Sequence, residues 1–162
     1  MVYRAVLVGC GGMSRGWLKA LKESALAGRV ELVGLVDVNL DAAIRLREEA
    51  GLVVAVGTDL TAVMAATAPD LIFDVVVPDG RHDVVAAGLA HGCHVLSEKP
   101  MAASLAEAGD LVRLAAVTGR IHAVVQNRRY IGGVRRIRAL VESGALGELT
   151  ALHADFFIGA HF

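Results

Sequence analysis

The sequence has few cysteines, little net charge and no long apolar run, and each scarcity excludes a class of protein. Its two cysteines, Cys10 and Cys93, form neither a CxxC pair nor a disulfide framework, which suits a reducing cytoplasm. A formal net charge of −1 gives no electrostatic case for binding nucleic acid or an anionic membrane. Charged residues or proline interrupt every apolar run before it reaches the roughly 18 residues of a membrane span. We therefore expect a cytoplasmic protein with no nucleic-acid or membrane partner.

Aromatic residues are also scarce, at 4% of the 162 residues, whereas hydrophobic residues make up 55%. The dominance of Ala, Val, Leu and Gly is typical of a parallel sheet covered by helices on both faces. The first residues lead directly into an apolar strand, unlike a signal peptide. The most basic stretch, residues 128–138, is short, and we interpret it as a solvated helix face.

Strand and helix signals alternate along the chain. Apolar runs predict strands at residues 4–9, 31–37, 53–56, 71–77, 94–97 and 121–126. Helical periodicity predicts helices at residues 14–27, 40–50, 60–66, 81–91, 104–117 and 131–143. Single helices between successive strands require right-handed crossovers. The predicted fold class is therefore α/β, a doubly wound parallel sheet.

The strongest functional signal is the stretch YRAVLVGCGGMSRG at residues 3–16. An apolar strand runs into Gly9-Cys10-Gly11-Gly12-Met13-Ser14, and a helical pattern begins at once. Gly9 can take the tight turn, Gly11 leaves room for a pyrophosphate, and the small Ser14 lets helix and strand pack closely. The amides that open the helix would face that phosphate, aided by the helix dipole. This pattern predicts a dinucleotide-binding unit; a bare strand-to-helix turn is the alternative.

Cys10 lies in the same turn. A helix N-terminus can lower the pKa of a thiol, but this position is a variable spacer of the glycine pattern. We therefore expect no nucleophilic catalysis by Cys10.

A carboxylate ends the second apolar run. Asp37 lies 23 residues after Ser14, where the acid that binds the adenosine ribose is expected. It would repel a 2′-phosphate, so we expect NAD as cofactor, in preference to NADP. The alternative role for Asp37 is a helix cap, which Asn39 or Asp41 could also provide.

The end of the chain follows a different pattern. After the helix at 131–143, the alternating stretch 149–157 predicts one more strand, which needs a partner sheet. We interpret residues 1–127 as the dinucleotide-binding domain. Residues 128–162 would be a hinge helix and the first strand of a second domain that is otherwise absent. The free apolar edges of that strand predict a homo-oligomer.

Three further segments lie at the predicted carboxyl ends of strands, where open α/β sheets bind ligands. They are VVVPDGRH at 75–82, VLSEKP at 95–100 and QNRRY at 126–130. Together with the GCGGMS turn and Asp37, they closely resemble the Gfo/Idh/MocA oxidoreductase family, which includes glucose–fructose oxidoreductase and inositol dehydrogenase. The EKP tripeptide after HVLS is the most specific element, and NRRY followed by SGALGEL adds support.

The resemblance implies a site for the two phosphates and the adenosine. The pyrophosphate would be lined by Gly9, Gly11, Gly12, Met13 and Ser14. Asp37 would bind the ribose. Pro78 and His82 match the loop at the edge of the cofactor, although Asp79 stands where the family usually has Asn or Pro.

The resemblance also implies a reaction centre. Glu98 and Lys99 would lie beside the nicotinamide, with Lys99 reaching the substrate hydroxyl, and a cis peptide would precede Pro100. Asn127 and Arg128 match the segment that enters the hinge between the domains.

Physical chemistry supports part of the role implied for Lys99. Burial in a crevice would lower its pKa from about 10.4 toward neutrality, which makes a usable proton donor or acceptor. Pro100 excludes a helix interior at this position. The alternative is a surface ion pair with Glu98 or Asp79.

The remaining candidate ligands and aromatics point to structure rather than chemistry. We expect no metal site, because His91 and His94 flank Gly92 at a helix end and lack partners at ligand spacing. We interpret His122 as a core or edge histidine and Trp17 as a packing residue.

These features predict the N-terminal portion of a nicotinamide-dependent oxidoreductase that transfers hydride to or from a sugar, cyclitol or related polyol. Because the family takes its substrate pocket from the second domain, we expect the 162-residue chain to bind NAD without turnover. Two alternatives are a non-catalytic dinucleotide-binding module or redox sensor, and a small-molecule methyltransferase, against which EKP and NRRY argue.

Overall fold

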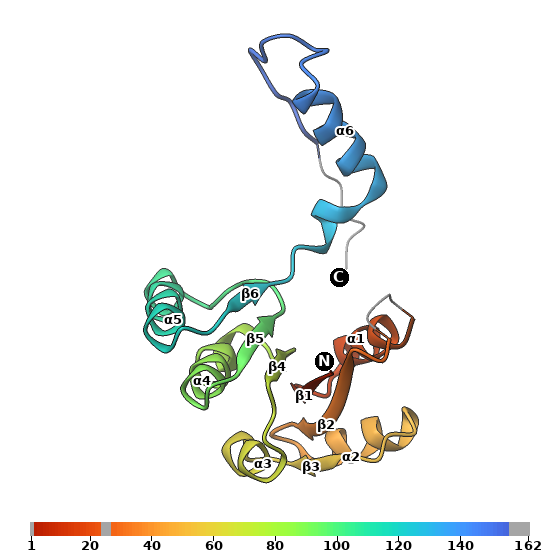
Figure 1. Cartoon of the computed structure of the whole chain (residues 1–162), viewed down its shortest axis with the longest axis vertical. Coiled ribbons are helices and arrows are strands. Elements are labelled where there is room, and N and C mark those ends of the chain that lie inside the picture. Colours follow the sequence, from red (N-terminus) through yellow and green to blue (C-terminus); the bar gives the residue numbers. More distant parts are fainter. Residues whose placement is uncertain (1, 24–26, 156–162) are drawn as a thin grey trace. The chain divides into compact units, whose positions relative to one another are not determined.

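The computed structural model describes residues 2–23 and 27–155, which divide into two compact units at 125/126. The first unit is built on a six-stranded sheet in the order β3-β2-β1-β4-β5-β6, with every neighbouring pair parallel (Figure 1). The strands are β1 (Tyr3–Val8), β2 (Val30–Val36), β3 (Ala55–Gly57), β4 (Leu71–Asp74), β5 (His94–Ser97) and β6 (His122–Val124). The predicted doubly wound parallel sheet is confirmed.

Five helices connect these strands. They are α1 (Gly12–Glu23), α2 (Leu40–Glu49), α3 (Leu60–Thr67), α4 (Pro78–Ala90) and α5 (Leu105–Thr118). The second unit contains a 3-10 helix, η1 (Asn127–Tyr130), and α6 (Gly132–Glu142). Within the described residues, no helix is long and apolar enough to cross a membrane.

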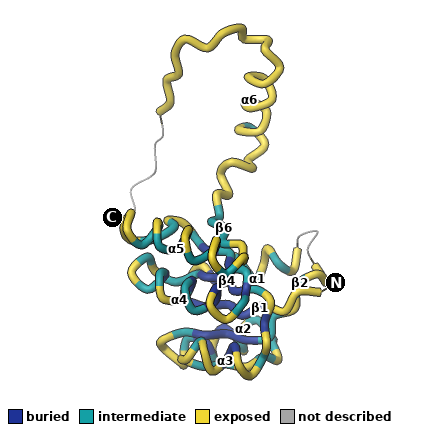
Figure 2. Tube along the Cα trace, turned by 60° about the vertical axis from the view of Figure 1, so that its left-hand side comes forward, coloured by how far each residue is buried: buried dark blue, intermediate teal, exposed yellow. Residues whose placement is uncertain are grey.

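The sheet separates two apolar layers because successive side chains of a strand point to opposite faces. In β1, Ala5 and Leu7 pack with Leu46 of α2 and with α1, whereas Val6 and Val8 pack with α3, α4 and α5. All four residues are buried, and buried residues concentrate on the strands of this unit (Figure 2). Continuous burial on both faces explains why the strands read as apolar runs without alternation.

Side-chain caps fix where several helices begin. Asn39 accepts a hydrogen bond from the amide of Asp41 at the start of α2, and Asp59 and Ser104 cap α3 and α5. At its other end α5 stops at Gly119 in the left-handed conformation. The cap of α2 is therefore Asn39, which leaves the Asp37 carboxylate for another role.

The connection between β4 and α4 differs from the expected boundaries. The sequence predicts a strand to residue 77 and a helix from residue 81, but β4 ends at Asp74 and α4 begins at Pro78. Proline is favoured at the first position of a helix, where its fixed φ fits and its missing N–H costs no hydrogen bond. Pro78 therefore begins the helix that also carries His82, whereas the resemblance places both residues in a loop.

The strand predicted at 149–157 is absent from residues 149–155, which form no helix or strand. A strand requires a neighbour for its backbone hydrogen bonds, and none of the described strands pairs with this segment. Phe156 and Phe157 lie outside the described residues.

Candidate functional site

The register of the sheet sets four residues in a row at its carboxyl edge. Val8 pairs with Val36 and Asp74, and Asp74 pairs with Ser97. The residues that follow are therefore neighbours across the edge, in the order Asp37, Gly9, Val75 and Glu98. Backbone hydrogen bonds continue into this row, from Gly9 to Val36 (2.8 Å), Val75 to Val8 (2.8 Å) and Glu98 to Asp74 (2.8 Å).

A cavity of about 370 Å³ opens along this edge. Its walls come from the ends of β1, β2 and β4, from the residues before α3 and from the first turns of α4. The lining residues are Val8, Gly9, Gly11, Val36, Asp37, Val38, Thr58, Leu60, Val75, Val76, Val77, Gly80 and Val84. It is a mostly apolar slot with one carboxylate at its rim.

The glycine turn has one tight position and two open ones. Gly9 has φ +93°, and a Cβ there would lie 2.7 Å from the carbonyl carbon and oxygen of Val75. At Gly11 and Gly12 a Cβ would meet nothing within 4 Å. Gly9 is therefore required by the approach of β4, whereas Gly11 and Gly12 leave the start of α1 accessible. The first amides of a helix have no intrahelical acceptor and favour an anion.

Ser14 packs beneath the glycine turn, in the interior of the fold. Its side chain is fully buried, and its hydroxyl donates a hydrogen bond to the carbonyl of Gly11. Met13, by contrast, is 60% exposed at the start of α1. Ser14 thus stabilises the turn by close packing, as its small size predicts.

Asp37 ties the end of β2 to the glycine turn. Its Oδ2 accepts a hydrogen bond from the amide of Cys10 (2.7 Å), and its Oδ1 accepts one from the amide of Asn39 (2.8 Å). These two bonds fix the carboxylate at the rim of the cavity. The amide of Cys10 is already used, so an anion at the turn would be met by the later amides at Gly11, Gly12 and Met13.

The thiol of Cys10 is held in its neutral form. Burial raises its pKa to about 12, with a further contribution from the charge of Asp37. The lowering that a helix N-terminus could produce is not found. This agrees with the expectation that Cys10 is no nucleophile.

Glu98 and Lys99 follow β5 directly. Glu98 is half-buried and accepts hydrogen bonds from the indole Nε1 of Trp17 (2.9 Å) and from the amide of Lys99 (3.2 Å). Lys99 is exposed, and the Lys99–Pro100 peptide bond is cis, as the resemblance implies. The burial in a crevice that was expected for Lys99 is not present in this structure.

Trp17 is more than the packing residue that the sequence suggests. Its ring packs on Phe73 of β4 at a centroid distance of 5.3 Å, and its N–H also holds Glu98. The sequence carries no signal for this bond, because Trp17 and Glu98 are 81 residues apart.

His82 and Pro78 lie in the first turns of α4. The Nε2 of His82 is 2.8 Å from Asp110 of α5, and this bond raises the pKa of His82 above its ordinary value. Gly80, from the same turn, lines the cavity, but His82 does not. The structure therefore brings Gly9, Gly11, Asp37 and the β4–α4 segment together and turns His82 toward α5.

A buried polar network was not predicted. Arg81 and Asp74 form an ion pair of 2.7 Å with side chains only 1% and 0% exposed. Asp74 also interacts with Ser97, whose hydroxyl lies 3.0 Å from Nε2 of His122. Burial raises the pKa of Asp74, and its bonds from Ser97 and Arg81 oppose that rise. The signal in the sequence was an aspartate within the apolar run 71–77, because a buried charge requires a partner.

Asn127 and Arg128 belong to η1 in the second unit, and both are exposed. Their predicted part in the hinge remains a prediction. Among the described residues, no group of three or more His, Cys, Asp or Glu side chains could hold a metal ion.

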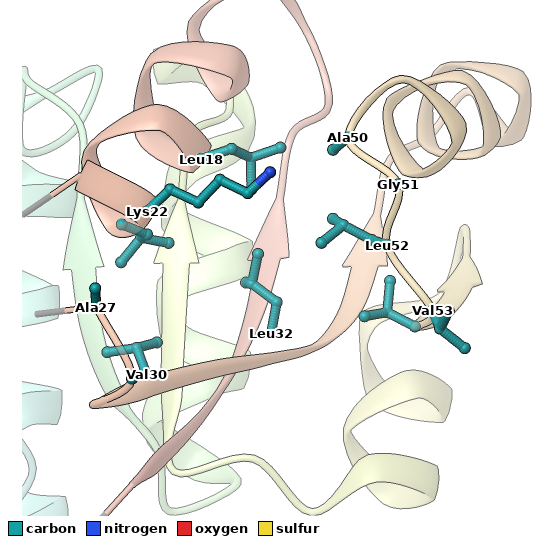
Figure 3. A pocket seen from close by; sticks show the side chains of 12 residues that line it. Leu18, Lys22, Ala27, Val30, Leu32, Ala50, Gly51, Leu52 and Val53 are labelled. Atoms are coloured by element: carbon teal, nitrogen blue, oxygen red, sulfur yellow. The ribbon is translucent and has the colours of Figure 1, made fainter.

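A second cavity of about 370 Å³ lies at the opposite edge of the sheet, near the amino ends of β2 and β3. Figure 3 shows Leu18 and Lys22 of α1 and Leu52 and Val53 of the α2–β3 connection around it. It lacks the glycine turn and the carboxylate, and open α/β sheets bind ligands at the other edge.

The sheet order, the accessible helix start and the placed carboxylate define a dinucleotide-binding Rossmann domain. The family described as "Oxidoreductase family, NAD-binding Rossmann fold" matches residues 3–126. The chain therefore belongs to the Gfo/Idh/MocA oxidoreductases, and its first unit is their NAD-binding domain.

Similar proteins agree in class. D-xylose dehydrogenase from Paenarthrobacter nicotinovorans is 31% identical over 99 residues, which are 61% of this chain and 26% of that protein. Inositol 2-dehydrogenase from Pseudomonas savastanoi pv. phaseolicola is 25% identical over 154 residues, which are 94% of this chain and 45% of that protein. The chain thus spans less than half the length of these relatives.

The solved structures share the fold. WlbA dehydrogenase from Bordetella pertussis, in complex with NADH and UDP-GlcNAcA, superposes with a TM-score of 0.84 at 24% identity. The match covers 91% of this chain and 44% of that one.

Proposed function

We propose that this chain is the NAD-binding part of a dehydrogenase that acts on a carbinol carbon of a sugar, cyclitol or related polyol. The observation that carries the proposal is the row of Asp37, Gly9, Val75 and Glu98 beside an accessible start of α1. The named relatives that act on xylose and inositol support the substrate class.

The residues present fit a dinucleotide. The open space at Gly11 and Gly12, with the first amides of α1, suits the pyrophosphate, with Met13 and Ser14 completing the turn. The fixed carboxylate of Asp37 suits the adenosine ribose, and the apolar slot between Val38 and Val76 suits the flat adenine. Pro78 starts the helix beside this slot, and His82 supports that helix from the far side.

On the nicotinamide side, the chain supplies orientation and proton transfer. When bound, the nicotinamide accepts or donates the hydride. Glu98, held by Trp17, orients this end of the crevice, and Lys99 gives or takes the proton of the substrate hydroxyl. Asn127 and Arg128 would lead the chain toward further substrate-holding residues.

Turnover requires more than these residues. The reacting atoms must be held within about 3.5 Å with a base near the hydroxyl, and Lys99 alone does not hold a polyol. We therefore expect the 162-residue chain to bind NAD without oxidising polyols. The division at 127/128 into a binding domain and the start of a second domain is part of this proposal.

An assay of NADH formation with D-xylose, myo-inositol and related polyols tests the proposal. A longer form of the protein with a second domain should reduce NAD. In that form, Lys99→Ala should abolish the reaction and leave the NADH affinity within threefold of the parent value. NADH binding without turnover in any longer form would favour the alternative, a non-catalytic dinucleotide-binding module or redox sensor.

We also propose that the protein works as a homo-oligomer in the cytoplasm. Both cysteines are free and buried, which suits a reducing compartment. The exposed apolar side chains of α6, among them Ile137 at 63% and Val134 at 45%, support self-association. Light scattering tests it: a monomer at all concentrations would refute the oligomer.

A further inference from the structure

Arg81 is the largest fully buried side chain among the described residues, although it is charged. It is 1% exposed, and its guanidinium donates hydrogen bonds in three directions. Nε reaches Oδ2 of Asp74 (2.7 Å), Nη2 reaches the carbonyl of Val76 (2.6 Å), and Nη1 reaches the carbonyl of Pro100. Burying a cation is costly, so a side chain retained there with three acceptors calls for an explanation.

The three acceptors lie on two segments, one at the wall of the proposed cofactor crevice and one beside Lys99. Val76 belongs to the wall of the crevice, and Pro100 directly follows Lys99. Asp74, the last residue of β4, holds both Arg81 and the crevice wall, because its other carboxylate oxygen accepts a hydrogen bond from the amide of Val76 (3.1 Å). One rigid planar fork thus connects the wall of the crevice to the segment that carries Lys99.

The position of Lys99 depends on this segment. Among the described residues, no ion pair or side-chain hydrogen bond holds the Lys99 ammonium, and Lys99 is exposed. Its backbone is fixed by β5 on one side and by the bond from Arg81 to Pro100 on the other. The ion pair with Asp74 explains why the charge of Arg81 is tolerated, but it does not require the bond to Pro100.

We propose that Arg81 is a positioning residue that sets the Lys99–Pro100 segment against the crevice wall at Val76. The inference rests on the proposed function only in giving Lys99 a role at the nicotinamide. The placement of the segment by Arg81 holds whether or not a cofactor binds.

Three variants separate placement from stability. Arg81→Lys keeps a charge beside Asp74 but replaces the fork with one head group. The double variant Asp74→Asn with Arg81→Met removes both charges, so that no buried carboxylate is left unpaired. Asp74→Asn is the matched control, because it changes the ion pair and keeps the bonds of Arg81 to Val76 and Pro100.

Amide hydrogen exchange in the cofactor-free chain is the deciding measurement. We expect exchange at Lys99 and Ala103, whose amides donate to Glu98 and Glu107, to accelerate at least tenfold in both variants that lack Arg81. In Asp74→Asn the exchange rates of the same amides should stay within threefold of the parent values, after correction for any change in global stability. Equal acceleration in all three variants, unchanged exchange without Arg81, or failure of both Arg81 variants to fold would overturn the proposal.

A second arm reads Lys99 itself. The chain has only three lysines, Lys19, Lys22 and Lys99, so ¹³C-methylation gives separate signals with two surface lysines as internal controls. NADH should shift the Lys99 signal in the parent chain and in Asp74→Asn, and the shift should fall at least threefold without Arg81. An unchanged Lys99 response without Arg81 would contradict positioning. No response in the parent chain would refute the role of Lys99 in the proposed function, and the exchange result would still decide the role of Arg81.

Discussion

The indole N–H of Trp17 donates a 2.9 Å hydrogen bond to Oε1 of Glu98, which joins α1 to the residue before Lys99. The start of α1 is the proposed phosphate site, and Glu98 is the proposed nicotinamide side. One side chain thus links the two ends of the candidate cofactor site.

This link makes Trp17 both a support and a reporter. It is the single tryptophan of the chain, so its emission should be quenched by energy transfer to bound NADH. Trp17→Phe keeps a ring on Phe73 and removes the bond to Glu98, which should lower the free energy of unfolding by about 1 kcal/mol. NADH affinity should fall as well, measured by NADH fluorescence. Unchanged stability and affinity would show that the bond contributes nothing.

Asp37 should set the choice between cofactors. Its fixed carboxylate would repel a 2′-phosphate, and this discrimination is worth on the order of 1–3 kcal/mol in favour of NADH. Asp37→Asn keeps an oxygen for the amide of Cys10 but removes the charge. The ratio of NADH affinity to NADPH affinity should therefore fall at least fivefold. Fluorescence titration of both cofactors measures it. Equal or tighter NADPH binding by the parent chain would contradict the assignment.

Gly9 and Gly11 form a matched pair for the glycine turn. Gly9→Ala places a Cβ against the carbonyl of Val75 and should destabilise the fold by about 1–3 kcal/mol. Gly11→Ala meets open space and should change stability by less than about 0.5 kcal/mol, while NADH affinity falls because the methyl stands in the path of the phosphate. Urea unfolding and NADH titration of both variants test this. Full NADH affinity in Gly11→Ala would remove the pyrophosphate from this turn.

The His82–Asp110 pair should make stability depend on pH. The hydrogen bond that His82 donates to Asp110 raises the pKa of His82 in the folded protein. Its stabilisation is therefore fully present below about pH 6.5, the unfolded value, and is lost as the pH rises through the folded value. The stability advantage of the parent chain over Asp110→Asn should be larger at about pH 5.5 than at about pH 8.

Two checks isolate this effect. Arg113→Ala removes the other partner of Asp110 but keeps the pair with His82, so its difference in stability from the parent should be the same at both pH values. His122 works in the opposite direction, because burial lowers its pKa, but its contribution is common to both proteins and cancels in the difference. A difference between the parent and Asp110→Asn that is the same at both pH values would refute the prediction.

The sequence was sufficient for the parts of the fold that depend on local pattern. Continuous apolar runs such as residues 5–8, glycine at helix ends and the turn before α1 follow from short-range chemistry, and single helices between successive strands indicate a parallel sheet with right-handed crossovers. The sequence did not predict the features that depend on tertiary contacts. Nothing local to Arg81 indicates that Asp74 and Pro100 will surround it, and nothing local to Trp17 points to Glu98. Residues 149–155 alternate like a strand but have no described neighbour to pair with.

The location of the cofactor is the central claim, and backbone amide chemical shifts measured during NADH titration test it most directly. The 16.9 kDa chain suits this measurement. We predict saturable shifts at Gly11, Gly12, Asp37, Val76 and Lys99, along the carboxyl edge of the sheet, and no shift at Leu32 or Leu52 around the cavity at the amino edge. Shifts confined to the amino edge, or the absence of any saturable shift, would contradict the account.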